Sequence, residues 1–184
     1  MGGYHVAGAQ LEAGAFPTSY IPTTGTSATR SADIATITGT AFSGWYRQDE
    51  GTICTETVFA GTVASQTGVA ALYQVGATNT NRISLRVGNT LITSGGVGSA
   101  TFAPAASLGA VGRWATAYRA DNFAQSVNGG APVVDTAGAS PVSINEMEIG
   151  GIEGSASNTL NAPIARLVYW PQRLPNHILQ SLTR

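Results

Sequence analysis

The sequence predicts an all-β fold, an antiparallel sandwich of two sheets with an extended N-terminal arm and one short C-terminal helix. From residue 32 onward, short segments that alternate apolar and polar residues are separated by clusters of Gly, Asn, Ser and Thr, as in all-β sandwiches. Helical periodicity is nearly absent. With 184 residues and 43% hydrophobic content, the chain can bury one core, so we expect one sandwich domain plus an arm.

The strand predictions rest on this alternation. Ile83 and Leu85, for example, alternate with polar residues that begin at Arg82, which predicts one strand face on the core and the other in solvent. The predicted strands are residues 32–38, 51–60, 69–75, 82–87, 90–93, 113–120, 122–128, 131–135, 144–150 and 162–170.

Turn residues predict two hairpins and two irregular stretches. Asn and Gly in 87–90 and in 127–130 stand where a tight turn requires positive φ, so each pair of flanking strands should be antiparallel neighbours. Residues 60–68 and 95–112 lack clear periodicity and should be loops or irregular edge strands.

One helix is predicted, at residues 175–183. Pro175 suits a first helical turn, and Ile178, Leu179 and Leu182 fall on one side of the helix. We expect this helix to cap one end of the sandwich.

Composition and charge exclude several classes of partner. The chain has no Lys, and nine Arg balance ten acidic residues to a net charge of −1, so we expect no nucleic-acid partner. No apolar run reaches the length of a membrane span and no basic and apolar leader begins the chain, which favours a protein made in the cytosol without membrane insertion. The single cysteine, Cys54, should be a buried small hydrophobe.

The N-terminal region reads as a junction between two β-domains. Pro17 and Pro22 force an extended path between Gly- and Ala-rich segments. We therefore expect residues 1–16 to be an arm, or the remnant last strand of a preceding domain, 17–31 to be a linker, and 32–184 to be the sandwich.

Four stretches together resemble a known family, the bacteriophage tail-fibre and head-fibre proteins that carry a concanavalin A/laminin G-like jelly roll. The junction GAQLEAGAFPTSYIPTT (8–24) resembles the point where a jelly roll begins after another domain. The stretches FSGWYRQDEGT (42–52), NFAQSVNGG (122–130) and IARLVYWPQRL (164–174) follow in the family's order.

The resemblance implies a jelly-roll virion component, assembled in the host cytoplasm, displayed on a tail or head fibre, and offered to host-surface glycans. It also implies a homo-oligomer, expected to be a trimer, with the arm contacting other virion proteins. The chain departs from the metal-dependent lectins of this fold, because Asp33, Asp49, Asp121 and Asp135 are scattered rather than gathered in one loop. We therefore expect no metal and no cofactor.

Catalysis is the least supported function. Glu146 and Glu148 share one strand face, as in glucanases of this fold, but Gly151 stands where the glucanase pattern needs a second catalytic carboxylate. We expect a solvent-facing acidic pair. His5 and His177 are far apart in the sequence, which disfavours a catalytic triad.

Aromatic residues are the best hint of a sugar site, because pyranose rings stack on indole and phenol rings. Trp114 and Trp170 lie in predicted strands and should be core residues. Trp45 and Tyr46 are consecutive, so we expect one side chain buried and the other available for a ligand or a neighbouring subunit. The predicted ligand-contacting residues are Trp45, Tyr46, Arg47, Asn81, Arg82, Asp121 and Asn128.

Two functions thus remain open from the sequence. The first is a non-enzymatic fibre domain that binds host glycans and gains affinity from several linked copies. The second is a purely structural capsid or tail decoration protein without glycan binding. A polysaccharide-degrading enzyme ranks third.

Overall fold

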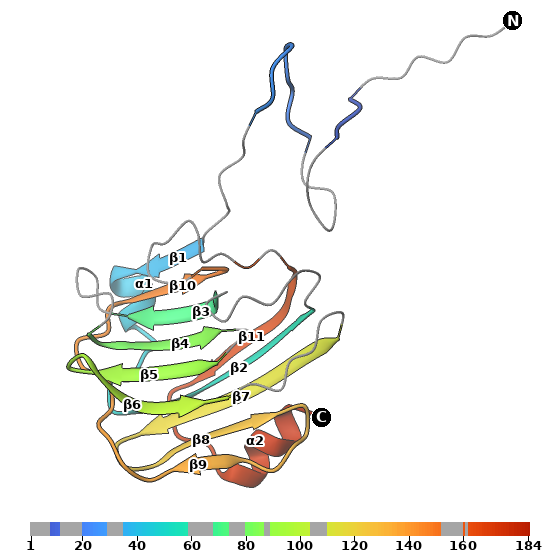
Figure 1. Ribbon diagram of the computed structural model, residues 1–184. Helices are drawn as coiled ribbons and strands as arrows, with labels where there is room; N and C mark the ends of the chain where they lie inside the picture. Colours follow the sequence, from blue (N-terminus) through green and yellow to red (C-terminus); the bar gives the residue numbers. More distant parts are fainter. Residues whose placement is uncertain are drawn as a thin grey trace, which may run out of the picture.

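The computed structural model describes residues 8–11, 20–28, 35–58, 68–73, 80–86, 89–103, 110–151, 160 and 162–184. These residues form an antiparallel sandwich of two sheets, as predicted, with two short helices where one was predicted (Figure 1). Each predicted strand has a counterpart, and the described ends differ from the predicted ends by a few residues.

Sheet A has six strands in the order β1-β10-β3-β4-β5-β6. Strand β10 comes from late in the chain and pairs with β1 on one side and β3 on the other, so it closes the jelly-roll topology. The strands are β1 (Ala35–Thr38), β3 (Gly68–Tyr73), β4 (Arg82–Arg86), β5 (Thr90–Ser94), β6 (Val97–Phe102) and β10 (Glu146–Ile149).

Sheet B has five strands in the order β11-β2-β7-β8-β9. The long strands β2 and β7 pair along their whole length, and β11 forms the edge beside β2. The strands are β2 (Glu50–Val58), β7 (Val111–Arg119), β8 (Phe123–Val127), β9 (Val133–Asp135) and β11 (Ile164–Trp170).

The main core lies between the two sheets. Sheet A contributes Ile83 and Ile92, and sheet B contributes Ile53, Tyr118 and Phe123, all with no exposed surface. Alternation along β4 places Ile83 and Leu85 in this core, as predicted.

A buried polar bridge joins the sheets inside this core. The Gln125 side-chain amide donates to the Thr90 hydroxyl at 2.5 Å and to the Thr116 hydroxyl at 2.8 Å. These groups are buried and cannot bond to water, so the hydrogen bonds between them offset the free-energy cost of burying polar atoms.

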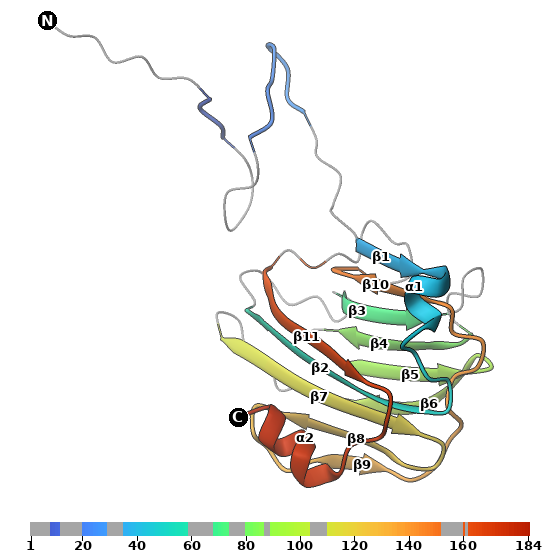
Figure 2. The same cartoon turned by 180° about the vertical axis from the view of Figure 1, so that it is seen from behind.

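A second core lies on the outer face of sheet B, under helix α2 (Asn176–Leu182) (Figure 2). Leu179 packs there against Cys54, and both are fully buried. Cys54 is thus the buried small residue that the sequence predicted. Trp170 belongs to this cluster and is partly buried, so its predicted place in the main core is wrong. Trp114, by contrast, is 2% exposed in a third cluster.

One local feature differs from the sequence prediction and another agrees with it. A single-turn helix, α1 (Gly39–Ser43), follows β1, and five residues are too few to produce a helical period in the sequence. Gly95 and Gly96 have φ of +60° and +80° and form the tight turn between β5 and β6. Strand β6 is the edge strand of sheet A and its pairing with β5 contains a register shift, in agreement with the irregular edge strand predicted for this stretch.

The hairpin between β8 and β9 is as predicted. Asn128 and Gly129 have φ of +47° and +75°, and the Gly130 amide donates to the Val127 carbonyl at 2.8 Å. The other predicted turn, 87–90, and the predicted loop 60–68 lie largely outside the described residues.

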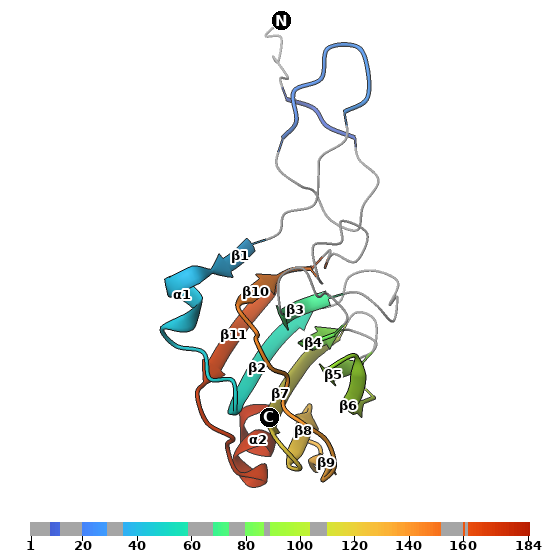
Figure 3. The ribbon, with the colours of Figure 1, turned by 90° about the vertical axis from the view of Figure 1, so that its left-hand side faces the viewer.

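The described parts of the arm and linker, 8–11 and 20–28, lie apart from the sandwich (Figures 1 and 3). They touch each other, because the Ile21 amide donates to the Gln10 side-chain carbonyl at 2.6 Å. Leu11 is wholly exposed and Tyr20 is 56% exposed. The rest of the predicted arm, and the predicted domain boundaries at 16 and 31, lie outside the described residues.

Candidate functional site

An open cavity of about 740 Å³ lies at the flank where β1 and β10 of sheet A approach β11 of sheet B. We call it the flank cavity. Strands β1 and β11 are the outermost strands of their sheets on this side, so the space between the sheets opens outward here. Its volume falls within the range of small-molecule sites, about 300–1,000 Å³. The lining residues are Ile37, Gly44, Trp45, Tyr46, Arg47, Met147, Ile149, Leu167, Tyr169 and Pro171.

An aromatic cluster forms one side of the flank cavity. Trp45 meets Phe42 and Tyr169 edge to face, with ring centroids 4.9 Å apart in each case. Tyr46 stacks on the buried Phe42 at 4.7 Å. The Trp45 indole N–H donates to the Ala41 carbonyl at 2.6 Å. Phe42 from α1 therefore anchors the two aromatic residues that follow it.

Trp45 and Tyr46 do not have the predicted arrangement, with one ring buried and the other exposed. Both are partly buried, and both line the flank cavity. They lie in the turn after α1, where the strand rule of alternating faces does not apply.

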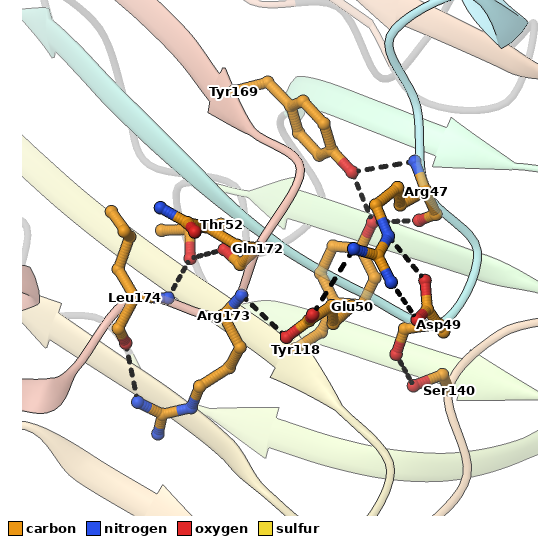
Figure 4. Close-up of polar contacts among 10 residues, drawn as sticks. All are labelled: Arg47, Asp49, Glu50, Thr52, Tyr118, Ser140, Tyr169, Gln172, Arg173 and Leu174. Atoms are coloured by element: carbon orange, nitrogen blue, oxygen red, sulfur yellow. Dashed lines mark hydrogen bonds and ion pairs between the residues drawn. The ribbon is translucent and has the colours of Figure 1, made fainter.

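A closed ring of hydrogen bonds fixes the segment that carries these aromatics (Figure 4). The Arg47 amide donates to the Tyr169 hydroxyl at 3.0 Å, and the Tyr118 hydroxyl donates to the Arg47 carbonyl at 2.6 Å. The two hydroxyls are 2.9 Å apart, and because Tyr118 has used its hydrogen, Tyr169 is the donor between them. Burial is the main cause that raises the pKa of both hydroxyls.

Charged groups mark the outer rim of the flank cavity. The Arg47 guanidinium pairs with both carboxylate oxygens of Asp49 and lies 3.6 Å from a Glu50 oxygen. The hydrogen bond from Arg47 holds the pKa of Asp49 below its usual value. The side chains of Arg47 and Asp49 are 48% and 64% exposed, so this group faces solvent.

Three of the predicted ligand residues instead hold the backbone of turns. The Asn81 side-chain oxygen accepts from the Gly95 amide at 3.0 Å and the Val142 amide at 3.3 Å. The Asp121 carboxylate accepts from Gly138, and Asn128 accepts from Arg113. Asp121 and Asn128 flank opposite ends of β8, so the structure does not bring the predicted set together.

Arg82, the remaining predicted residue, lies on the outer face of β4. This face was predicted to be solvated, yet Arg82 and Arg86 are only 8% and 6% exposed, so that prediction is wrong. Burial, and secondarily the charge of Arg86, lower the pKa of Arg82 to about 10. Both guanidiniums are covered by protein.

The acidic pair of β10 was predicted to face solvent, and for Glu148 this prediction is wrong. Glu146 and Glu148 alternate along the strand and share the outer face of sheet A, as predicted. Glu148 is 1% exposed, however, and it lies in the same cross-strand row as Ser84, which is fully buried. Position along a strand predicts the face of a side chain but not what covers that face.

Most of the cavity walls were not predicted as site residues. Ile37, Met147 and Ile149 face the core side of sheet A, while Leu167 and Tyr169 face it from β11. Their alternation in the sequence predicts inward-facing residues. Met147 is buried, and the other four remain partly exposed because β1 and β11 are edge strands, which only the strand order reveals.

Within the described residues, no cluster of three or more His, Cys, Asp and Glu side chains could hold a metal ion. Nor does any helix in this part of the chain have the length and apolarity to cross a membrane.

Comparison with known proteins shows the fold. No protein-family model matches the sequence, and no curated protein matches it either. Among solved structures, the NanB sialidase from Streptococcus pneumoniae matches with a TM-score of 0.62 and 16% identity over 82% of this chain. This chain spans only 27% of that sialidase.

Two further solved structures also match. The CBM40 of the Ruminococcus gnavus IT-sialidase matches with a TM-score of 0.56 and 13% identity, over 74% of this chain and 84% of that domain. Domains LG4-5 of the mouse laminin alpha1 chain match with a TM-score of 0.50 and 14% identity, over 71% of this chain and 38% of that chain. The sandwich is therefore a concanavalin A/laminin G-like jelly roll.

Proposed function

We propose that this chain is a non-enzymatic, glycan-binding jelly-roll domain of a virion fibre, and that the flank cavity is its glycan site. The observation that carries the proposal is the cavity itself, where the half-buried rings of Trp45, Tyr46 and Tyr169 border an open space of about 740 Å³. Sugar rings present C–H faces that pack on such rings while their hydroxyls remain toward water.

The structural neighbours support a carbohydrate ligand. The Ruminococcus gnavus CBM40, which shares this fold, has been seen with α2,3 and with α2,6 sialyllactose bound. At 12% and 16% identity the similarity concerns the sandwich fold alone. The residues that bind a sugar in this chain therefore have to be identified from its own structure.

The virion setting rests on the resemblance of four stretches to phage fibre proteins. In a fibre, several copies of the domain would be presented together. A shallow sugar site is weak alone, and linking copies can raise the apparent affinity by about 10²–10⁴. A homotrimer joined through its N-terminal arms would supply this multivalency.

A structural decoration protein without glycan binding is the second candidate. Apolar residues outside the cavity favour it: Leu11 in the arm is wholly exposed, and Val133 and Val134 on the edge strand β9 are 63% and 44% exposed. Such residues suit contact with other proteins.

Catalysis by the β10 carboxylates is not part of the proposal. Glu148 is 1% exposed, so a polysaccharide could not reach it without displacing the groups that cover it.

A glycan array probed with the domain on a multivalent carrier separates the two candidates. Binding should occur and should be lost in Trp45→Ala, while Val133→Ser, on the opposite edge of sheet B, should bind like the parent. Thermal melting should show both variants folded. If no glycan is bound, or if Trp45→Ala remains folded and binds like the parent, the proposed site is wrong.

A further inference from the structure

We propose that the flank cavity selects neutral sugars with a methyl-bearing substituent, an N-acetyl group or a 6-deoxy carbon, over fully hydroxylated sugars and over sugar acids. This rests on the proposed function, that the cavity binds glycans.

The first argument is the composition of the walls. Five lining side chains are aliphatic and come from β1, β10, β11 and the residue after β11: Ile37, Met147, Ile149, Leu167 and Pro171. None of them offers a hydrogen bond of useful strength. A sugar hydroxyl pressed against such a wall loses its water without replacement, whereas a methyl group gains from leaving water.

The second argument is that the polar atoms of Trp45 and Tyr169 are already in use, and that the Tyr46 hydroxyl is buried out of a ligand's reach. The Trp45 indole N–H donates to Ala41, and the Tyr169 hydroxyl both accepts from Arg47 and donates to Tyr118. These residues therefore offer the faces and edges of their rings rather than hydrogen-bonding groups. A ligand rich in hydroxyls would find few partners inside the cavity.

The third argument is charge. Arg47 is the charged residue among the described lining residues, and its guanidinium already pairs with Asp49 and lies beside Glu50. One guanidinium and two carboxylates leave a net charge of −1 at the rim. This net negative charge would repel a carboxylate on the sugar. The repulsion would be modest because the rim is exposed to solvent and screened by salt.

A titration followed by NMR tests the inference with sugars that share one parent ring. Glucose is compared with N-acetylglucosamine and 6-deoxyglucose, which carry the two kinds of methyl group separately, and with glucuronic acid. At least one methyl-bearing sugar should bind roughly fourfold or more tightly than glucose, as expected for one buried methyl group. Glucuronic acid should bind more weakly than glucose at low salt, with the difference shrinking as salt is added.

Variants tie the selectivity to the walls. Ile149→Thr and Ile37→Thr keep a β-branched side chain but replace its ethyl branch with a hydroxyl, so each should lower the preference for the methyl-bearing sugar. Val133→Thr makes the same kind of change, from an apolar branch to a hydroxyl, on the distant strand β9; it is the control and should leave the preference unchanged. Melting curves show which of the two cavity variants is folded, and the sugar selectivity of a folded variant is then compared with that of the parent.

The possible outcomes distinguish a failure of the selectivity inference from a failure of the proposed glycan binding. Equal affinities for glucose and both methyl-bearing sugars, or tighter binding of glucuronic acid, would overturn the inference and leave glycan binding intact. Unchanged selectivity in both folded cavity variants would also overturn it. If no sugar shifts any cavity resonance, and the array is blank as well, the proposed function falls and the inference falls with it.

Discussion

At the residue scale, Tyr118 is the link between the core and the flank cavity. Its ring is fully buried between the sheets, and its hydroxyl holds the Arg47 carbonyl at 2.6 Å. Through Arg47 it fixes the turn that presents Trp45 and Tyr46. A phenol in this position must stay protonated, because a buried phenolate would lose both hydration and the hydrogen bond that it donates.

Alkaline pH should therefore destabilise the protein through Tyr118. Its pKa is raised in the folded state by burial above all, so its contribution to stability is complete below the unfolded pKa of about 10 and declines as the pH rises further. Above that pH the free energy of unfolding should fall by about 1.4 kcal/mol per pH unit for this group. Urea unfolding at increasing pH measures the slope. Tyr118→Phe should show a shallower slope, and an equal slope would refute the assignment.

Gly51 is required because the Tyr118 ring occupies the space where a side chain would be. A β-carbon at Gly51 would lie 2.6 Å from the Tyr118 hydroxyl oxygen, whereas one at Gly98 on β6 would meet nothing within 4 Å. Gly51→Ala should destabilise by about 1–3 kcal/mol through overpacking. Gly98→Ala is the control and should be neutral or slightly stabilising. Similar effects of the two substitutions on denaturant midpoints would contradict this.

The candidate site was predictable from sequence only in part. Aromatic chemistry beside a charged turn identified Trp45, Tyr46 and Arg47, and these three do lie together. Asn81 and Asp121 were also predicted to contact a ligand, but the structure uses both to hold backbone amides. An Asn or Asp side-chain oxygen that holds a turn and one that binds a ligand look alike in the sequence, because both occur where the chain reverses direction.

At the element scale, the strands could be predicted from the sequence because each has one face on a core and therefore alternates apolar with polar residues. The alternation of Ile83 and Leu85 located β4 correctly. What covers the outer face of a sheet depends on distant segments, so the burial of Arg82 and Glu148 could not be read from the same pattern. Helix α2 was predicted, but its role in covering Cys54 and Trp170 on sheet B was not.

Trp170 should stabilise the protein by holding α2 against sheet B rather than by filling the main core. Trp170→Ala should destabilise by about 2–4 kcal/mol, toward the low end for a large aromatic because the ring is only partly buried. His177→Ala changes an exposed residue of the same helix and serves as the control. Amide exchange in α2 should rise selectively in Trp170→Ala. A loss of stability without faster exchange in α2 would point to the main core instead.

At the scale of the whole molecule, the described arm segments and the sandwich are separate in space. Removing residues 1–28 should therefore shift the melting temperature of the sandwich by no more than a few degrees. If the arms join the copies of a homotrimer, as proposed above, the truncated protein should lose its oligomeric state. Light scattering of the two forms measures this. An unchanged oligomer would refute the predicted role of the arm, and a large loss of stability would place the arm within the core of its own sandwich.

The central claim, that the flank cavity binds sugar, has a direct spectroscopic test in the indole N–H resonances of the three tryptophans. Trp45 lines the cavity, Trp114 is buried between the sheets, and Trp170 lies under α2. Titration with the glycans that bind on the array should shift the Trp45 resonance in a saturable way and leave the other two in place. A Trp45 resonance that does not move while those glycans bind, or a shift confined to Trp114 or Trp170, would contradict the claim.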